Sequence, residues 1–398
     1  MAEPAVHGFV HPRFSSVGEA FVANFQRRGE MGASVVVRHR GEVVVDLHAG
    51  MADPDTAREW DADTPVVVFS ATKGLVAIAT LMLVARGQLE LDAPVADVWP
   101  GFGISGKAHV TVRQLLNHRS GLSVIDEPLD LHDFANPVRI DAVLEAQPPQ
   151  WAPGHTQAYG ATAWGAFMGG LFRKVTGMGV GRWFAEHIAA PLGLAAWIGA
   201  GPEVLARRAQ LITVSSQERM RHHLPALFVR GTAEGRIGRR LLLGKRTLVG
   251  QALLNPDLGP RRLDVMNDPS VLALELPWMG AVCTADALSK AYAAVIGEVD
   301  GVRLVDPTVV KPLRVRQSWS ERDGVLQKPM GFAQGFVKEP EGVFSPNPAS
   351  FGHPGAGGAL GWADPDAELA IGYVMNRMDW RIRSPRAIAL TRAIYASL

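Results

Sequence analysis

The run Val66-Val67-Val68-Phe69-Ser70-Ala71-Thr72-Lys73-Gly74-Leu75 places a hydroxyl and an amine three residues apart, directly after an apolar strand. Residues at this spacing share one face of a helix. An unperturbed serine is a poor nucleophile, and a desolvated lysine with a lowered pKa can activate it. The run therefore predicts a nucleophile, Ser70, with its own base, Lys73. The competing interpretation is a helix start with Ser70 as N-cap, since roughly one Ser-x-x-Lys is expected by chance in such a chain.

Helices and antiparallel strands are predicted at both ends of the chain. A capped helix precedes a hairpin that turns at Arg40-Gly41, and the turn-rich Asp364-Pro365-Asp366 joins two strands near the C-terminus. The last helix begins at Pro385, with Ser384 as its N-cap. The predicted ranges are 17–28, 33–39, 42–47 and 65–69, then 350–353, 360–363, 370–376 and 385–397.

The middle of the chain has helical spacing, with Pro and Gly between the segments. The predicted helices are 70–86, 111–117, 161–176, 180–190 and 284–296, the last with Thr284 as N-cap. This pattern is expected when a helical domain is inserted into an α/β layer domain. We therefore predict an α/β plus α fold in which terminal helices flank an antiparallel sheet. Residues 1–75 and 325–398 would form the discontinuous α/β domain, and residues 76–324 a mainly helical domain.

Composition describes a compact soluble protein: 47% of the 398 residues are hydrophobic and the net charge is +1. The balanced charge gives no reason to expect nucleic acid or an acidic membrane as the main partner. The longest apolar stretch, Leu75 to Ala85, is too short to span a bilayer. Residues 1–8 have no basic segment followed by an apolar core, so we expect no signal peptide. The sequence predicts a cytoplasmic enzyme without a membrane span, and leaves a homo-oligomer open.

Neither the cysteine nor the histidines indicate a cofactor. Cys283 is the single cysteine and lies in the apolar run 279–285, which is typical of a structural thiol. The histidines, including His222-His223, lack metal-ligand spacing. We expect no metal ion and no other cofactor.

Residues 219–262 form a basic insertion with ten arginines and lysines and few acids. Aromatic residues are sparse in it, so we expect a solvated surface excursion rather than a nucleic-acid or lipid contact. A mobile flap over a pocket is the other interpretation left open, because long insertions without regular structure are often functional.

Other motifs follow the Ser-x-x-Lys run in a fixed order. Residues 115–122 read Leu-Leu-Asn-His-Arg-Ser-Gly-Leu, Pro153-Gly154 precedes Tyr159, residues 186–194 read Glu-x-Ile-x-x-Pro-Leu-Gly-Leu, and residues 352–355 read Gly-His-Pro-Gly. In this combination the chain resembles the serine β-lactamase and penicillin-binding-protein superfamily over nearly its whole length. Within it, the chain is most similar to the class C β-lactamase-like branch and to the family VIII carboxylesterases. The resemblance implies a β-lactamase/transpeptidase-like fold.

The resemblance also implies a mechanism. Ser70 would attack an ester carbonyl, with Lys73 and Tyr159 sharing its proton, and Tyr159 would pass a proton to the departing alkoxide. Water would then release the acyl group by the reverse path. By analogy, the backbone N–H groups of Ser70 and Ala356 would form the oxyanion hole.

Two departures from the β-lactamase pattern favour a small neutral ester as the substrate. Tyr159-Gly160-Ala161 lacks the Asn side chain of the Tyr-x-Asn motif, and His353-Pro354-Gly355 replaces Lys-Thr-Gly. The fixed ammonium that attracts an antibiotic carboxylate is therefore missing, because histidine is only partly charged near neutrality. His353 would line the substrate pocket, and Gly355 would let its strand approach closely.

Several alternatives remain at this stage. Tyr159 could be a core aromatic residue, and His118 is expected to be structural. Within the same chemistry, a weak β-lactamase, a D-amino-acid peptidase or amidase, and an acyltransferase are all compatible with the motifs. A non-catalytic binding protein on the same fold is the alternative from another class. A conventional α/β-hydrolase is disfavoured, because no Gly-x-Ser-x-Gly pentapeptide is present.

Overall fold

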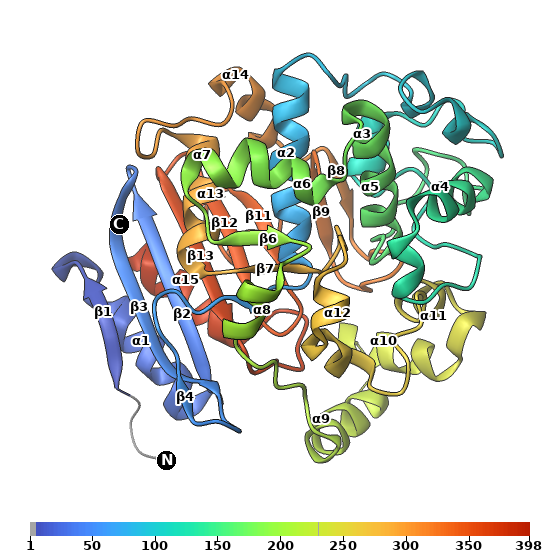
Figure 1. Cartoon of the computed structure of the whole chain (residues 1–398). Helices are drawn as coiled ribbons and strands as arrows, with labels where there is room; N and C mark the ends of the chain where they lie inside the picture. Colours follow the sequence, from blue (N-terminus) through green and yellow to red (C-terminus); the bar gives the residue numbers. More distant parts are fainter. Residues whose placement is uncertain (1–4, 230) are drawn as a thin grey trace.

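A large antiparallel sheet forms the centre of the computed structural model, which describes residues 5–229 and 231–398. Residues 1–4 and Arg230 lie outside the described residues. The expectations for residues 1–8 and for the basic insertion 219–262 fall partly on them. The strand order is β1-β3-β2-β13-β12-β11-β10-β9-β8, and β4 pairs with β3 (Figure 1). Strand β2, near the N-terminus, pairs with β13, near the C-terminus, from Ala33 opposite Met375 to His39 opposite Leu369. The two ends of the chain therefore share one sheet, as predicted.

The predicted N-terminal hairpin is confirmed, and local backbone geometry explains it. Arg40 and Gly41 have φ values of 56° and 84°, which two-residue hairpin loops favour because such turns match the strand twist. A second, three-stranded sheet has the order β5-β7-β6. The strands of the large sheet are β1 (Val6–Val10), β2 (Gly32–His39), β3 (Glu42–Asp53), β4 (Arg58–Glu59), β8 (Ser318–Ser320), β9 (Met330–Ala333), β10 (Phe336–Val337), β11 (Phe351–Pro354), β12 (Leu360–Asp364) and β13 (Leu369–Met375). Those of the small sheet are β5 (Val66–Val67), β6 (Ala196–Ile198) and β7 (Ala281–Cys283).

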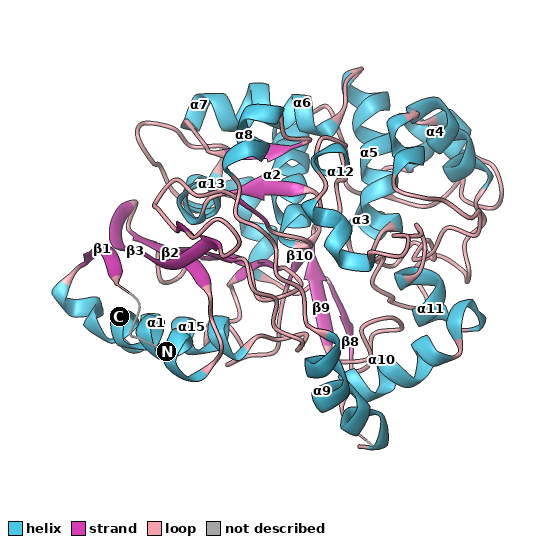
Figure 2. Ribbon diagram, turned by 60° about the horizontal axis from the view of Figure 1, so that its bottom comes forward, coloured by secondary structure: helices cyan, strands magenta, loops and turns pink. Residues whose placement is uncertain are grey.

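Helices cover both faces of the large sheet. The terminal helices α1 (Ser15–Arg27) and α15 (Pro385–Ala396) pack together on one face, while α13 (Ala285–Ile296) packs against β2, β12 and β13 on the other (Figure 2). Helix α13 comes close because Gly372 has no side chain: a Cβ there would lie 2.0 Å from the Ala285 carbonyl oxygen. The predicted caps are present, since Thr284 and Ser384 accept hydrogen bonds from the backbone N–H of Ala287 and Arg386.

Further helices complete the described fold, and several of them lie farther from β1 than α2 does (Figure 1). They are α2 (Ala71–Ala85), α3 (Val112–Leu116), α4 (Pro137–Ala146), α5 (Ala163–Thr176), α6 (Val180–Phe184), α7 (Ala190–Leu192), α8 (Pro202–Arg207), α9 (Ser216–Phe228), α10 (Ala233–Leu242), α11 (Leu248–Leu253), α12 (Pro269–Leu272) and α14 (Pro307–Val310). In the described part of the chain, none of the helices has the length and apolar character needed to cross a bilayer.

Two observations bear on the predicted domains and the basic insertion. Helix α13 and strand β8 lie within the range 76–324 but pack on or pair with the large sheet, so the two-domain division stays a proposal.

The expectation that residues 219–262 lack regular structure is wrong, because they contain most of α9 and all of α10 and α11. Local capping helps to form these helices: the Thr232 and Thr247 hydroxyls accept hydrogen bonds from the Gly235 and Gly250 N–H groups, each at 3.1 Å.

Candidate active site

Ser70 lies at the turn between strand β5 and helix α2, at the N-cap position, but its side chain makes no capping hydrogen bond to the helix. The turn is tight: Phe69 has a φ of 47°, an uncommon conformation for a bulky residue that is often found at functional sites. Strand β7 holds the turn in place, because Val68 N–H donates to Ala281 O at 3.0 Å and Ala281 N–H donates to the Thr72 hydroxyl at 2.9 Å. Thr72, which lies between Ser70 and Lys73, thus connects the start of helix α2 to the small sheet through this hydrogen bond.

Lys73 is fully buried beside Ser70, with 3.4 Å between its Nζ and Ser70 Oγ. Its Nζ also donates to two backbone carbonyls, Ala161 O at 2.8 Å and Trp278 O at 3.0 Å. Burial holds the pKa of Lys73 well below its usual range. Among the described residues, desolvation alone accounts for this shift in the pKa of Lys73.

Tyr159 is buried with its hydroxyl hydrogen-bonded to Ser70. The Tyr159 ring centroid is 4.9 Å from Lys73 Nζ, so the side chains of Ser70, Lys73 and Tyr159 form one cluster. Burial raises the pKa of Tyr159 far above its usual range, and the hydrogen bond from Ser70 only partly opposes that shift. The resting side chain is therefore a neutral phenol that keeps its proton.

Asp323 positions the backbone of Tyr159 and was not singled out from the sequence. Its carboxylate is fully buried and accepts hydrogen bonds from the N–H groups of Tyr159, Val325 and Leu326, at 2.9 to 3.1 Å. The Gln157 side chain donates a further hydrogen bond to it at 3.3 Å. Desolvation raises the pKa of Asp323, and these four donors oppose that shift. The short loop that carries Tyr159 is thus held against the turn that follows β8.

His118 supports the same loop from below. Its Nδ1 accepts a hydrogen bond from Gly160 N–H at 3.0 Å, which places the ring proton on Nε2. The ring centroid lies 4.8 Å from that of Tyr159 and 4.4 Å from that of Phe332. Burial, together with the proximity of Lys73, keeps the pKa of His118 well below its usual range, so the imidazole is neutral. This position is consistent with the structural role expected from the sequence.

The Gly-His-Pro-Gly segment faces this group from strand β11. Gly355 lies against the strand before Ser70, because a Cβ there would be 2.2 Å from Val68 O. Among the described residues, neither Ser70 N–H nor the following Ala356 N–H donates a hydrogen bond to protein. Both N–H groups are therefore free to bind an oxyanion.

His353 is buried, and its ring centroid is 6.1 Å from that of Tyr159. Its Nδ1 is 2.8 Å from Pro354 O, a carbonyl that can only accept, so the proton is on Nδ1 and Nε2 is an unpaired acceptor. Burial, and secondly Lys73, lowers the pKa of His353 to about 3. The partial charge expected from the sequence is therefore wrong for this environment: the imidazole is neutral at physiological pH.

Comparison with known proteins shows the family of the chain. The sequence profile of the family described as Beta-lactamase matches residues 19–393. The chain belongs to the Beta-lactamase family. Its relatives include Esterase/beta-lactamase LipL of Mycobacterium tuberculosis, which is 34% identical over 94% of this chain and 83% of that protein.

Two solved structures extend the Beta-lactamase family resemblance to the fold. A family VIII carboxylesterase has a TM-score of 0.86 and 31% identity, and the match covers 99% of this chain and 100% of the other. A penicillin-binding protein homologue from Caulobacter crescentus has a TM-score of 0.84 and 32% identity, over 99% and 100% of the two chains. The β-lactamase/transpeptidase-like fold predicted from the motifs is confirmed.

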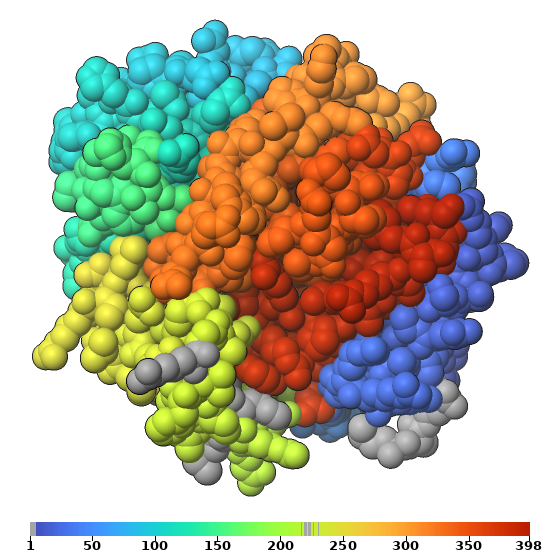
Figure 3. Space-filling view, turned by 180° about the vertical axis from the view of Figure 1, so that it is seen from behind, coloured from blue at the N-terminus to red at the C-terminus, as the bar shows by residue number. Residues whose placement is uncertain are grey.

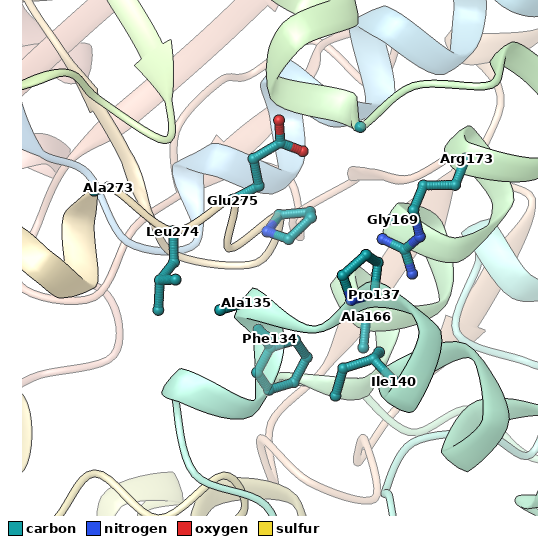
Figure 4. A pocket seen from close by; sticks show the side chains of 13 residues that line it. Phe134, Ala135, Pro137, Ile140, Ala166, Gly169, Arg173, Ala273, Leu274 and Glu275 are labelled. Carbon is teal, nitrogen blue, oxygen red and sulfur yellow. The ribbon is translucent and has the colours of Figure 1, made fainter.

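A separate pocket of about 320 Å³ is lined by residues of α4, α5 and the segment 273–277 (Figure 4). Its lining includes Phe134, Ile140 and Pro277, and the charged side chains of Arg173 and Glu275 stand on different sides of it. Neither Ser70, Lys73 nor Tyr159 lines this pocket. One lining residue, Pro277, directly precedes Trp278, whose carbonyl accepts a hydrogen bond from Lys73 Nζ.

Proposed function

We propose that the chain is a serine carboxylesterase that cleaves short-chain esters through an acyl-enzyme on Ser70. The observation that carries this proposal is the hydrogen bonding of Lys73. A neutral amine has two N–H bonds and one lone pair, and the carbonyls of Ala161 and Trp278 take the two N–H groups. The lone pair is then left for Ser70 Oγ, 3.4 Å away, so Lys73 is oriented as a base.

In the acylation step, Ser70 Oγ attacks the ester carbonyl as its proton passes to Lys73. Tyr159, a neutral phenol, gives its proton to the departing alkoxide and regains one from Lys73, so that the alcohol leaves and both groups return to their resting states. Water then attacks the acyl-enzyme: its proton returns through Tyr159 and Lys73 to Ser70, and the carboxylic acid leaves.

The negative charge that develops on the carbonyl oxygen needs donors that are already in place. The Ser70 and Ala356 N–H groups would supply them, because neither is engaged by the described part of the protein. The close approach of Gly355 to Val68 O, two residues before Ser70, supports the pairing of these two N–H groups at one oxygen.

The charge state of the site supports esters over β-lactam antibiotics. His353 stands where the lactamase motif has a lysine, and at a pKa of about 3 it provides no cation for a carboxylate. Ala161 contributes a carbonyl to Lys73 but no side-chain amide for a substrate. The names of the relatives, an esterase/beta-lactamase and a family VIII carboxylesterase, are consistent with ester hydrolysis.

Nitrophenyl esters of increasing acyl length, assayed beside a chromogenic cephalosporin, test the proposal. We expect the short acyl esters to be hydrolysed fastest, with Ser70→Ala as the blank. Preference for the cephalosporin would overturn the assignment to esters. A fluorophosphonate that labels the native protein no better than Ser70→Ala would exclude the acyl-enzyme itself. Addition of a competing alcohol separates hydrolysis from acyl transfer, because transfer yields a new ester.

A further inference from the structure

Helices α9 and α10 form a hairpin that exposes large apolar side chains. The helices contact each other where Arg239 Nη1 donates to Leu227 O at 2.5 Å. Around this contact, apolar residues are 50% to 80% exposed, and Phe228 is the most exposed of them. They are Leu224, Phe228, Val229, Leu242 and Leu243. Seen from behind, the hairpin projects from the body of the molecule (Figure 3).

Positive charge surrounds these apolar side chains. The hairpin sequence, residues 216–246, contains eight arginines and lysines and two acids, Glu218 and Glu234. Arg221, Lys245 and Arg246 are exposed. Glu234 faces the body of the protein, where its carboxylate accepts a hydrogen bond from Ile382 N–H at 3.4 Å. The exposed end of the hairpin is therefore both apolar and cationic.

We propose that this hairpin, residues 216–229 and 231–246, binds the surface of an anionic lipid membrane. Exposed leucine and phenylalanine side chains gain free energy by entering the boundary between headgroups and acyl chains, while lysine and arginine attract anionic headgroups. Nucleic acid would use the same cations but would leave the leucines in water. The proposal replaces our expectation from composition, which was a solvated excursion without a lipid contact.

The base of the hairpin rests on the turn that holds the catalytic tyrosine. Arg236 donates through Nε and Nη2 to Gln327 O, at 3.2 and 2.5 Å. Gln327 N–H in turn donates to the backbone carbonyl of Asp323 at 3.0 Å. The proposed membrane-binding hairpin is therefore connected, through the turn at Asp323, to the loop that carries Tyr159.

Vesicle flotation tests the membrane contact independently of catalysis. Vesicles of phosphatidylcholine alone are compared with vesicles containing three parts phosphatidylcholine to one part phosphatidylglycerol. We expect binding to the anionic vesicles only, weakened by added salt. Phe228→Ser with Leu242→Ser, and separately Lys245→Glu with Arg246→Glu, should each reduce the partition coefficient about tenfold or more.

Val138→Ser is the matched control, because Val138 is 79% exposed on α4, outside the hairpin. It should bind vesicles as the native chain does, and all variants should hydrolyse a soluble nitrophenyl ester at the native rate, which shows that they are folded. If the esterase proposal fails, far-ultraviolet circular dichroism serves the same purpose.

Three results would overturn the proposal: equal binding to both vesicle types, no binding to either, or no effect of the hairpin variants. It would also fail if light scattering showed a dimer that Phe228→Ser dissociates, because a second copy of the chain would then cover the face. Tight binding to a DNA duplex that survives Phe228→Ser with Leu242→Ser, without vesicle binding, would assign the cations to nucleic acid.

Discussion

Asp323→Asn tests whether a buried carboxylate positions the proposed proton donor. One oxygen of Asp323 accepts from the N–H groups of Tyr159, Val325 and Leu326, and the other accepts from Tyr159 N–H and the Gln157 side chain. The amide keeps one of these oxygens and has almost the same shape. It replaces the other oxygen with an NH₂ group, which would face the NH₂ of Gln157.

The expected cost follows from the strength of these bonds. A hydrogen bond to a charged acceptor contributes about 1.5–3 kcal/mol, and a neutral one about 0.5–1.5 kcal/mol, so three weakened bonds amount to about 3 kcal/mol. Removing a buried charge recovers part of this loss. We expect the free energy of unfolding to fall by roughly 1–3 kcal/mol. We expect kcat/KM to fall about 10- to 100-fold, because a displacement of the order of 1 Å at a catalytic group has such an effect.

The assay compares chemical unfolding with kcat and KM for a short nitrophenyl ester. Asp364→Asn is the matched control, since Asp364 is also fully buried and accepts from two backbone N–H groups, those of Asp366 and Ala367. Its other donors include the Tyr395 hydroxyl, at 2.6 Å, and it is not among the residues around Ser70. Asp364→Asn should lose stability without a comparable loss in kcat.

A double-mutant cycle separates positioning from general destabilisation. In a Tyr159→Phe background the hydroxyl is already absent, so Asp323→Asn should reduce kcat much less than in the native chain. Its effect on unfolding should be nearly unchanged. If the two losses in kcat multiply independently, or if Asp323→Asn is folded and fully active, the positioning role is refuted.

Three further predictions concern the groups around Ser70. In the proposed mechanism neutral Lys73 is the base, and its lowered pKa increases the neutral fraction at a given pH. The rise of kcat/KM with pH should therefore have an apparent pKa well below that of free lysine. A rise at the pKa of free lysine would contradict this role. Gly355→Ala places a methyl group 2.2 Å from Val68 O, so kcat should fall by roughly 100-fold or more, measured with the nitrophenyl ester, whereas an unchanged kcat would exclude the close approach. His353→Lys supplies the ammonium that the site lacks, so turnover of a carboxylate-bearing cephalosporin relative to the ester should increase; an unchanged ratio would show that charge at this position does not select the substrate.

The features that the sequence predicted well are those determined by neighbouring residues. The hairpin at Arg40-Gly41 depends on two residues with positive φ, and the caps at Thr284 and Ser384 depend on side chains that bond their own helix. Ser70 and Lys73 lie on one helical turn, so their proximity also follows from local geometry.

The features that the sequence did not predict depend on distant contacts. Asp323 is 164 residues from Tyr159, and the carbonyl of Trp278 is 205 residues from Lys73. A backbone carbonyl has no residue-type signal, so no motif could indicate that Ala161 and Trp278 orient the amine. The charge of His353 was misjudged for a related reason: its pKa depends on how completely the fold buries it.

If the proposed mechanism holds, the lowered pKa values of the described residues around Ser70 would let one site favour neutral substrates and still stabilise an ionic transition state. Lys73, His118 and His353 all have pKa values lowered mainly by burial, and proximity to Lys73 lowers the pKa of both imidazoles. A cation that is present in the resting site would attract a substrate carboxylate equally in the ground state and in the transition state. Such uniform binding does not accelerate the chemical step. In the proposed mechanism, the charge on Lys73 appears only when the Ser70 proton moves, at the same moment as the negative charge on the ester oxygen. The low-dielectric surroundings then strengthen the interaction between the two charges where it lowers the barrier.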